Sequence, residues 1–392
     1  MEKNIIITAI CLSMFLFTAC GKKTIKDNTL ETTGAKNELE DMGKIETATI
    51  KFDASQSMKG YFISNKPDFI NDISELIDKT GTTPKIYFVG QPKPYMGLLK
   101  DILSDLQKQP NDATSSFEQL FADMCKDVQD NDIQILMSDG IVSVGRNTDK
   151  ALKELKNKVK NKLKTYSGTR AMAILKYSAP FVSNAAKKAF YFNKDDKSVM
   201  LNFDERPFYV FVVGAPKTIR ALQKMDTSAE QKLFFGIHDS RAHDMSQSKQ
   251  TPSNLKLEKP NDPTKITIQL PKCLKDYSID YLKSNLYVLK NVTDTITKGL
   301  DIDITSNLYV TISIDNKFNP YKGDNGKVSY VVGIKNTLPE EWKKLSSDDD
   351  TNIDTNNSQK SMTFGLKYLL EAVMEGLQPE KDLINVKYEF KQ

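Results

Sequence analysis

Two near-continuous apolar runs do most to restrict how this 392-residue chain can fold: Ala171–Leu175 and Phe208–Val213. A strand in which almost every residue is apolar is buried on both faces, as in a parallel sheet that helices cover. Shorter strand-like runs and helical patterns alternate with these two from residue 47 onward. The alternation predicts an α/β domain over residues 47–226, built on a doubly wound, mostly parallel sheet.

The periodicity changes from about residue 227. Short strand-like runs then follow one another closely, with turn residues between them: Lys265–Leu270, Leu286–Leu289, Leu300–Ile304, Leu308–Ile314 and Val328–Ile334. Several alternate between apolar and polar residues, which is typical of an antiparallel sandwich. One helical pattern and a last alternating strand complete the chain. We therefore expect a β-rich domain over 227–392 with one late helix, which packs either on the sandwich or back on the first domain.

The turns that follow two of the expected strands carry oxygen side chains. Asp53, Ser55 and Ser57 form an Asp-x-Ser-x-Ser triplet directly after the strand expected at 47–52, and Asp139 lies in a Ser-Asp-Gly turn after a later buried strand. Carboxylate and hydroxyl oxygens are hard ligands that suit Mg²⁺ or Mn²⁺. Because ligands of such sheets lie at the carboxyl ends of the strands, the two turns predict a metal site at that edge.

Together with a threonine before a central helix, these turns resemble the metal-ion-dependent adhesion site of von Willebrand factor A (vWA) domains. The resemblance covers about residues 47–226 and implies a vWA, Rossmann-like fold with Mg²⁺, or Mn²⁺ or Ca²⁺ in its place. Residue by residue it implies five ligands: Asp53, Ser55, Ser57, Thr114 and Asp139. Family members usually have Gly-Thr at the threonine, whereas Ala113 precedes Thr114 here. Ser115 and Ser116 therefore stay as alternative third ligands.

The resemblance implies binding rather than catalysis. In such sites Ser55 and Ser57 would ligate the ion directly, and Asp53 and Asp139 would hold it mainly through coordinated waters. Few charged direct ligands leave the ion with residual positive charge and an exchangeable position, which an Asp or Glu of a protein partner can fill. The alternatives are a metal-dependent hydrolase, which lacks a positioned base near the motif, and a structural envelope module with a degenerate, metal-free site. A different α/β domain with incidental polar turns is a further interpretation.

Residues 177–206 interrupt the strand–helix alternation of the first domain. Two strand-like runs joined by Asn193–Lys197 indicate a hairpin inserted between two sheet strands. Because the insertion follows the carboxyl end of a strand, we expect it either to stand near the metal site or to decorate the edge of the sheet.

The sequence offers no convincing catalytic residue. Its only histidines, His238 and His243, lie in a loop-like segment without further ligands nearby, which favours a polar surface loop over a metal or acid–base site. Cys125 and Cys273 fall in different predicted domains and are expected to be unpaired. We therefore predict that the protein is not an enzyme.

The N-terminus predicts a lipid anchor. An apolar run from Ile5 to Phe17 follows Lys3 and has the length of a signal-peptide core, so residues 1–19 are expected to be removed. The run ends at Ala19-Cys20-Gly21, which resembles a bacterial lipobox and implies that Cys20 carries acyl chains such as palmitate, although an ordinary secretory signal is the alternative. Several acyl chains anchor a protein stably, and the polar residues 20–46 suit a flexible tether.

This context predicts a cell-envelope lipoprotein, and Gly21 after the cysteine favours the outer membrane. The net charge is only +4, from 55 basic and 51 acidic residues that are interspersed. Nucleic-acid binding needs a concentrated basic surface, so we expect no nucleic-acid partner. The expected partners are an acidic residue of another protein, through the metal, and the membrane, through the lipid.

Overall fold

The computed structural model describes residues 43–391 except 64–67, 98–100, 107–115, 143–147, 196, 238–263, 271–273, 275–276, 278, 292, 316, 319–326 and 379–381. The chain divides into two units, Met1–Asp41 and Met42–Gln392. The predicted signal peptide, Cys20 and all but the last few residues of the predicted tether lie outside the described residues. Within the described part, no helix is long and apolar enough to cross a membrane.

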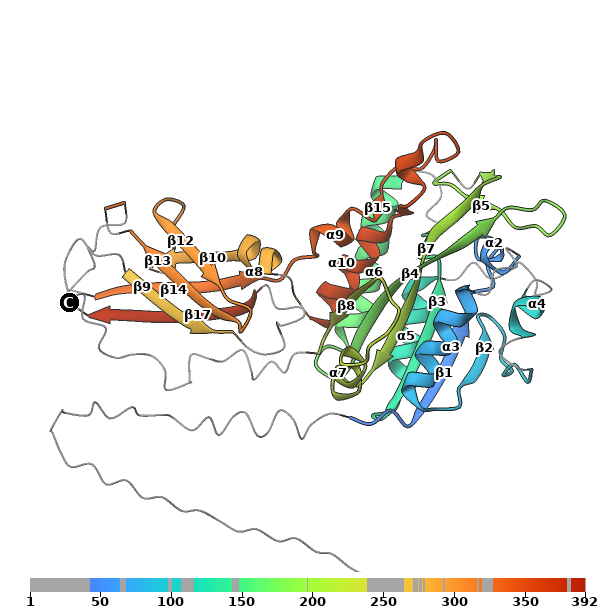
Figure 1. The fold of residues 1–392 in the computed structure, drawn as a ribbon, viewed down its shortest axis with the longest axis horizontal. Helices are drawn as coiled ribbons and strands as arrows, with labels where there is room; N and C mark the ends of the chain where they lie inside the picture. The colour runs from blue at the N-terminus through green and yellow to red at the C-terminus, as the bar shows by residue number, and fades with distance from the viewer. Residues whose placement is uncertain are drawn as a thin grey trace, which may run out of the picture. The chain divides into compact units, whose positions relative to one another are not determined.

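A six-stranded sheet forms the centre of the first domain, in the order β2-β1-β3-β7-β4-β8 (Figure 1). β1 pairs in parallel with β2 and β3, whereas the β3–β7, β7–β4 and β4–β8 pairings are antiparallel. The domain is mixed α/β, but its sheet is mixed rather than mostly parallel as predicted. The strands are β1 (Thr47–Phe52), β2 (Lys85–Phe88), β3 (Asp132–Ser138), β4 (Ala171–Val182), β7 (Asn202–Gly214) and β8 (Gln231–Phe235).

The antiparallel pairings begin with β7. This strand follows β4 through a hairpin and not through a crossover helix, so it must run back along β4. In the sheet, β7 lies between β3 and β4. A parallel arrangement would instead have placed β4 directly beside β3. Nearly every residue of β4 and β7 is buried, which confirms the two-faced burial inferred from their apolar runs.

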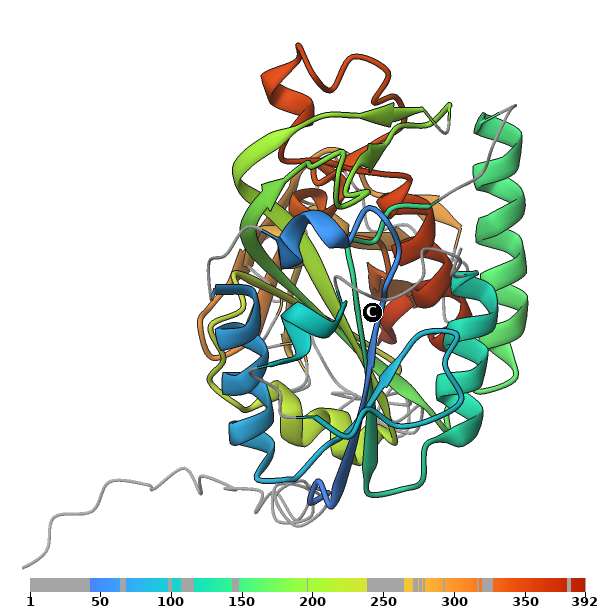
Figure 2. The same cartoon turned by 90° about the vertical axis from the view of Figure 1, so that its right-hand side faces the viewer.

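Helices cover both faces of this sheet (Figure 2). In α3, for example, apolar residues recur three or four positions apart and form one buried stripe that packs on the sheet. The first face is covered by α2 (Lys59–Phe62), α3 (Asp68–Thr80), α4 (Ile102–Leu106) and α7 (Pro216–Gln223). The second is covered by α5 (Phe117–Asp127), α6 (Thr148–Lys164), α9 (Glu340–Lys343) and α10 (Leu366–Leu377).

A long arm extends β4 and β7 past the end of β3. Ser138, the last residue of β3, pairs with Tyr209, whereas residues 202–207 of β7 continue in register with β4 alone. The short strands β5 (Tyr191–Phe192) and β6 (Ser198–Val199) lie in the connection between them. We call residues 177–208 the β4–β7 arm. It stands at the edge where β1 and β3 end, which is the first of the two positions expected for the inserted hairpin.

The second domain contains two antiparallel sheets that share one apolar core, in the orders β11-β10-β14-β17 and β12-β13-β9. All their pairings are antiparallel, as the alternating runs predicted. The elements are β9 (Thr264–Gln269), α8 (Ile279–Asn285), β10 (Leu286–Lys290), β11 (Asp294–Thr295), β12 (Leu300–Ile304), β13 (Tyr309–Ile314), β14 (Lys327–Lys335) and β17 (Asp382–Lys391).

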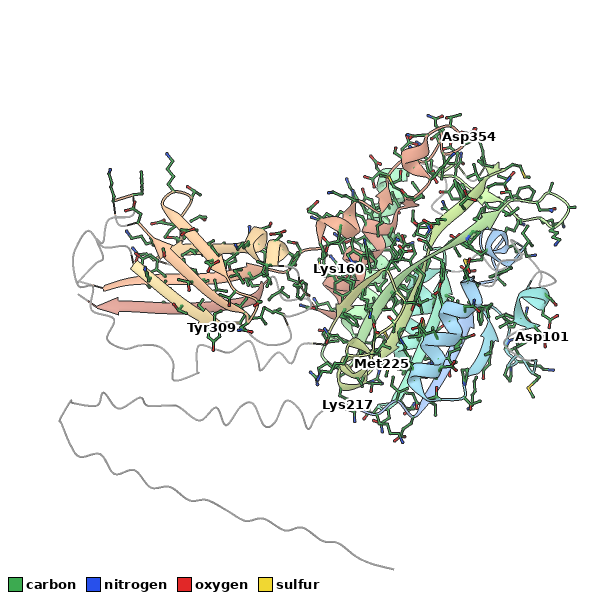
Figure 3. The ribbon with its side chains drawn as sticks, viewed as in Figure 1. Asp101, Lys160, Lys217, Met225, Tyr309 and Asp354 are labelled. Atoms are coloured by element: carbon green, nitrogen blue, oxygen red, sulfur yellow. The ribbon has the colours of Figure 1, made fainter. Side chains whose placement is uncertain are left out.

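The domain boundary differs from the predicted one between residues 226 and 227. β8 pairs with β4, and the segment 338–377, which also contains β15 (Ser346–Ser347) and β16 (Thr363–Phe364), packs into the core of the α/β domain. Lys156 of α6 forms 2.7 Å ion pairs with Glu371 and Glu375 of α10, and Lys160 joins Glu375 at 3.3 Å (Lys160 is labelled in Figure 3). The late helix thus returns to the first domain, because α6 offers it both an apolar stripe and matching charges.

Candidate metal centre

The triplet after β1 folds into a compact turn. The Ser55 N–H donates to Asp53 Oδ1 at 2.9 Å, which is the local turn that aspartate favours. The hydroxyls of Ser55 and Ser57 lie 3.1 Å apart, and both serines are partly exposed, whereas Asp53 is only 5 % exposed. The turn therefore brings two neutral hydroxyl oxygens together beside a buried carboxylate.

The turn after β3 meets the first one directly. Phe52 and Met137 are paired in register, and the Asp53 N–H donates to the Met137 carbonyl at 3.0 Å. The Ser138 hydroxyl then donates to Asp53 Oδ2 at 2.9 Å. Residues that are 85 positions apart in the sequence are thereby joined by a buried hydrogen bond, and the two turns meet at the edge of the sheet where they were expected.

Gly140 allows the second turn to close. Its φ of +69° lies in the left-handed region, and an added Cβ would stand 2.8 Å from the ring of Tyr209. The turn that results lets the Ile141 N–H donate to Asp139 Oδ1 at 3.1 Å. The other carboxylate oxygen of Asp139, Oδ2, is buried and accepts no hydrogen bond. A buried acceptor without a protein partner is uncommon, and a water molecule or an ion can serve as its partner.

Burial and mutual repulsion dominate the electrostatics of the two carboxylates. Burial first, and the charge of Asp139 second, raise the pKa of Asp53 to about 7, against the hydrogen bonds from Ser55 and Ser138. Burial also raises the pKa of Asp139, and the Ser57 hydroxyl, the Ile141 N–H and the charge of Arg206 oppose that rise. Two such groups are held ionised together most readily by a cation between them.

Four of the five predicted ligands are therefore gathered at one edge of the sheet: Asp53, Ser55, Ser57 and Asp139. Thr114 lies outside the described residues, as does Ser115, whereas Ser116 is exposed directly before α5. The choice of third ligand stays a prediction. Ser138 was not foreseen as a partner of Asp53, although its place beside Asp139 in the Ser-Asp-Gly turn was visible.

Arg206 is the residue that sequence reasoning missed. It is fully buried, and its guanidinium lies 4.5 Å from the ring centroid of Tyr191 and 5.3 Å from that of Phe203. Its charge acts on Asp139. The available signal was an arginine two positions before the apolar run Phe208–Val213.

Other candidate features do not add a second site. The two histidines and Cys273 lie outside the described residues, and burial raises the pKa of the free Cys125 thiol to about 12. Among the described residues there is no group of three or more His, Cys, Asp and Glu side chains fit to hold a metal. A centre of two carboxylates and several hydroxyls is not a group of this kind. The finding therefore argues against a zinc-type site only.

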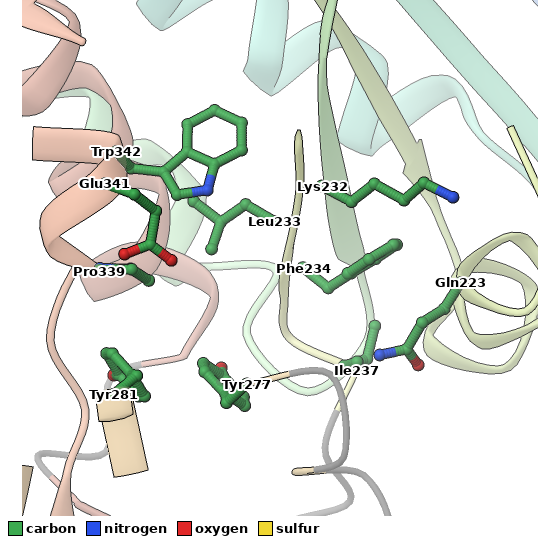
Figure 4. Close-up of a pocket in the computed structure, with 10 residues that line it drawn as sticks. All are labelled: Gln223, Lys232, Leu233, Phe234, Ile237, Tyr277, Tyr281, Pro339, Glu341 and Trp342. Carbon is green, nitrogen blue, oxygen red and sulfur yellow. The ribbon is translucent and has the colours of Figure 1, made fainter. Parts of the chain in front are cut away.

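A small pocket lies away from the two turns (Figure 4). Its lining includes Leu233 and Phe234 of β8, the aromatic rings of Tyr277 and Tyr281, and Trp342. None of its lining residues is a predicted ligand, and its surface is mostly aromatic and aliphatic. It therefore carries no chemistry related to Asp53 and Asp139.

No protein-family model matches this chain, and no curated protein or solved structure matches it either. The likeness to vWA domains consequently rests on the order of the two turns and on their convergence in space. No family membership follows from it.

Proposed function

We propose that Asp53, Ser55, Ser57 and Asp139, together with Thr114, bind a divalent cation, and that the cation holds an acidic residue of a protein partner. Mg²⁺ is the cation we favour, with Mn²⁺ or Ca²⁺ as substitutes, because every candidate ligand is a hard oxygen. In this proposal the α/β domain is a vWA-type domain that carries an adhesion-type site. The observation that carries the proposal is the unpartnered, buried Oδ2 of Asp139 beside a second buried carboxylate.

The distribution of the oxygens supports a binding role. The two carboxylates are buried, whereas the two serines are partly exposed, so in this proposal an ion held here is within reach of a partner at the serine side. An ion whose charge is incompletely neutralised retains an attraction for a carboxylate from outside.

The proposal extends to location. We propose that the protein is a cell-envelope lipoprotein that is anchored in the outer membrane through acylated Cys20. The polar segment 20–46 would give the α/β domain reach from the membrane surface. A tethered binding domain of this kind serves adhesion or the assembly of an envelope complex.

Capture of partners from envelope extract tests the function. The immobilised protein is incubated with extract in Mg²⁺ or in EDTA, and the bound proteins are compared for wild type, Asp53→Ala and Asp78→Ala. Asp78 is an exposed aspartate of α3 and serves as the matched control. We expect proteins that are retained in Mg²⁺ by wild type and Asp78→Ala and lost with EDTA or Asp53→Ala.

Identical retention in Mg²⁺ and EDTA would contradict a metal-mediated contact and favour the structural envelope module. Turnover of phosphoester or peptide substrates by the Mg²⁺-loaded wild type, absent from Asp53→Ala, would instead favour the hydrolase.

A further inference from the structure

Arg206 carries a positive charge in a place that water does not reach. A guanidinium stays protonated in proteins, and a buried charge is costly unless opposite charges or hydrogen bonds compensate it. Only Nη1 has an acceptor, the carbonyl of Lys360 at 3.3 Å, whereas Nε and Nη2 are buried without one. The rings of Tyr191, Phe203 and Phe181 surround the group at 4.5, 5.3 and 5.8 Å from their centroids. Aromatic faces alone compensate a buried cation only in part.

Two buried carboxylates feel this charge. Burial raises the pKa of Asp139 and that of Asp350, which is 1 % exposed, and the charge of Arg206 opposes both rises. Asp350 accepts hydrogen bonds from the Tyr191 hydroxyl and, at 2.7 Å, from the Lys194 N–H. The ring of the same Tyr191 is the one closest to the guanidinium. Arg206 thus acts on a carboxylate of the candidate metal centre and on a carboxylate of the 346–364 segment.

The arm that carries Arg206 is fixed against the triplet. The Tyr61 hydroxyl of α2 donates to the carbonyl of Pro207 at 2.6 Å, and the Tyr61 ring meets Phe181 edge to face at 5.2 Å. At Gly60 an added Cβ would stand 2.2 Å from the Phe181 ring, so the two elements touch closely. Because α2 follows Ser57 directly, the position of Arg206 relative to the triplet is well defined.

We propose that Arg206 is a positioning residue of the cation centre, whose fixed charge limits how strongly Asp139 attracts a metal ion and is itself balanced in part by Asp350. The inference rests on the proposed function and adds to it a residue that no adhesion-site motif contains. A cation already present beside Asp139 weakens the binding of a second one. The same charge adds to the positive field that an acidic partner would meet.

Opposite charge changes should therefore move the affinity for Mg²⁺ in opposite directions. Arg206→Gln removes the competing cation, and we expect the Kd for Mg²⁺ to fall about tenfold, which is 1.4 kcal/mol. Asp350→Asn leaves the guanidinium less balanced, and we expect the Kd to rise. Arg206→Lys keeps the charge, and we expect a Kd within about threefold of wild type.

The Kd is measured by calorimetric titration with Mg²⁺ alone, and each melting temperature is recorded in EDTA. Arg170→Gln is the matched control: its Nε and Nη2 donate to the carbonyls of Cys125 and Val128, both at 2.9 Å. Arg170 directly precedes β4, whereas Arg206 pairs with Ala179 toward the other end of that strand, roughly 30 Å away at the usual rise per residue. We expect Arg170→Gln to lower the melting temperature without changing the Kd.

A Kd for Arg206→Gln that is unchanged or higher than that of wild type overturns the inference, and so does an equal change in Arg170→Gln. If Arg206→Gln does not fold, a Kd for Asp350→Asn at or below that of wild type overturns it instead. Wild type that binds no Mg²⁺ at all overturns the proposed function, and the inference falls with it. If the wild type binds Mg²⁺ and the Kd is the same in all the variants, the proposed function stands and only the role of Arg206 is withdrawn.

Discussion

The cores of the two domains differ in what they bury. Among the described residues, the core of the β-rich sheets consists of aliphatic side chains and tyrosines, and the domain buries no charged, amide or small hydroxyl side chain. The α/β domain is larger and equally well packed, yet at the edge where β1 and β3 end it buries Asp53, Asp139 and Arg206. Apolar cores need no such groups for stability, and buried charges are often neutral or unfavourable for it.

The difference indicates which domain carries the chemistry. A fold retains buried charges that do not stabilise it when those charges bind something, and functional sites are where carboxyl pKa values are strongly displaced.

Truncating a core side chain in one domain at a time should show which domain unfolds together with Trp342. This residue is the single tryptophan of the chain and is buried against the α/β core. Phe121→Ala removes a fully buried ring that packs 5.1 Å from Phe211, and should cost about 3–5 kcal/mol. Ile312→Ala makes a comparable cavity in the β-rich core, at about 2–5 kcal/mol. In urea, we expect Trp342 fluorescence to shift its midpoint with Phe121→Ala and to keep it with Ile312→Ala.

If the midpoint instead shifts with Ile312→Ala and not with Phe121→Ala, Trp342 belongs to the β-rich domain, as a domain boundary at residue 227 would imply. Far-ultraviolet circular dichroism of the same samples is the control, because it should register both truncations.

A pair of glycine substitutions compares packing tolerance in the two domains. Gly60→Ala forces a methyl group within 2.2 Å of the fully buried Phe181 ring and should cost about 1–3 kcal/mol. Gly333→Ala meets the outer end of the half-buried Tyr287 ring, whose displacement costs the 2.9 Å hydrogen bond from its hydroxyl to Asp382. Melting temperatures should fall clearly for Gly60→Ala and less for Gly333→Ala. Equal decreases in melting temperature would show that the β4–β7 arm is no more tightly fixed than the β-rich sheet.

The pH dependence in EDTA should come from the α/β domain. Asp53 has a pKa of about 7 in the metal-free fold against 3.8 when exposed, so the folded state holds a proton that the unfolded state has lost between those values. The contribution of Asp53 to the free energy of unfolding is therefore fully present below about pH 4. It falls by up to ~1.4 kcal/mol per pH unit as the pH rises to 7, and it is constant above that pH. Denaturant midpoints at pH 5 and pH 8 measure it.

Asp53→Asn cannot titrate and should lose most of that slope. A slope that persists in Asp53→Asn would assign the titration to another group, such as Asp72, whose pKa burial raises to about 6.

The smallest effect on stability is expected at the N-terminus. Cys20→Ser removes the proposed acylation site, which lies outside the described residues. We expect melting of both domains to stay unchanged while the protein moves from the membrane pellet to the soluble fraction. Continued tight fractionation with membranes would contradict lipid anchoring through Cys20.

The sequence predicted the meeting of the two turns better than it predicted the topology of the sheet. Asp53 and Asp139 follow strands whose apolar patterns were plain, and parallel neighbours bring such turns together. By contrast, whether β7 runs with or against β4 depends on a connection that the apolar run Phe208–Val213 does not reveal. The return of α10 to α6 likewise depends on pairing Lys156 with Glu371, which are 215 positions apart in the chain. Arg206 escaped notice because its role depends on rings supplied by three separate segments.

The response of the melting temperature to Mg²⁺ tests the central claim, that Asp53 and Asp139 share a cation. Binding to the folded state alone stabilises it by RT ln(1 + [L]/Kd), or about 2.7 kcal/mol at 100 times the Kd. We expect wild type to melt higher in Mg²⁺ than in EDTA. Asp139→Asn should melt higher than wild type in EDTA, because the carboxylates no longer repel each other, and should gain much less from Mg²⁺. An Asp139→Asn protein with the full Mg²⁺ response would contradict the account.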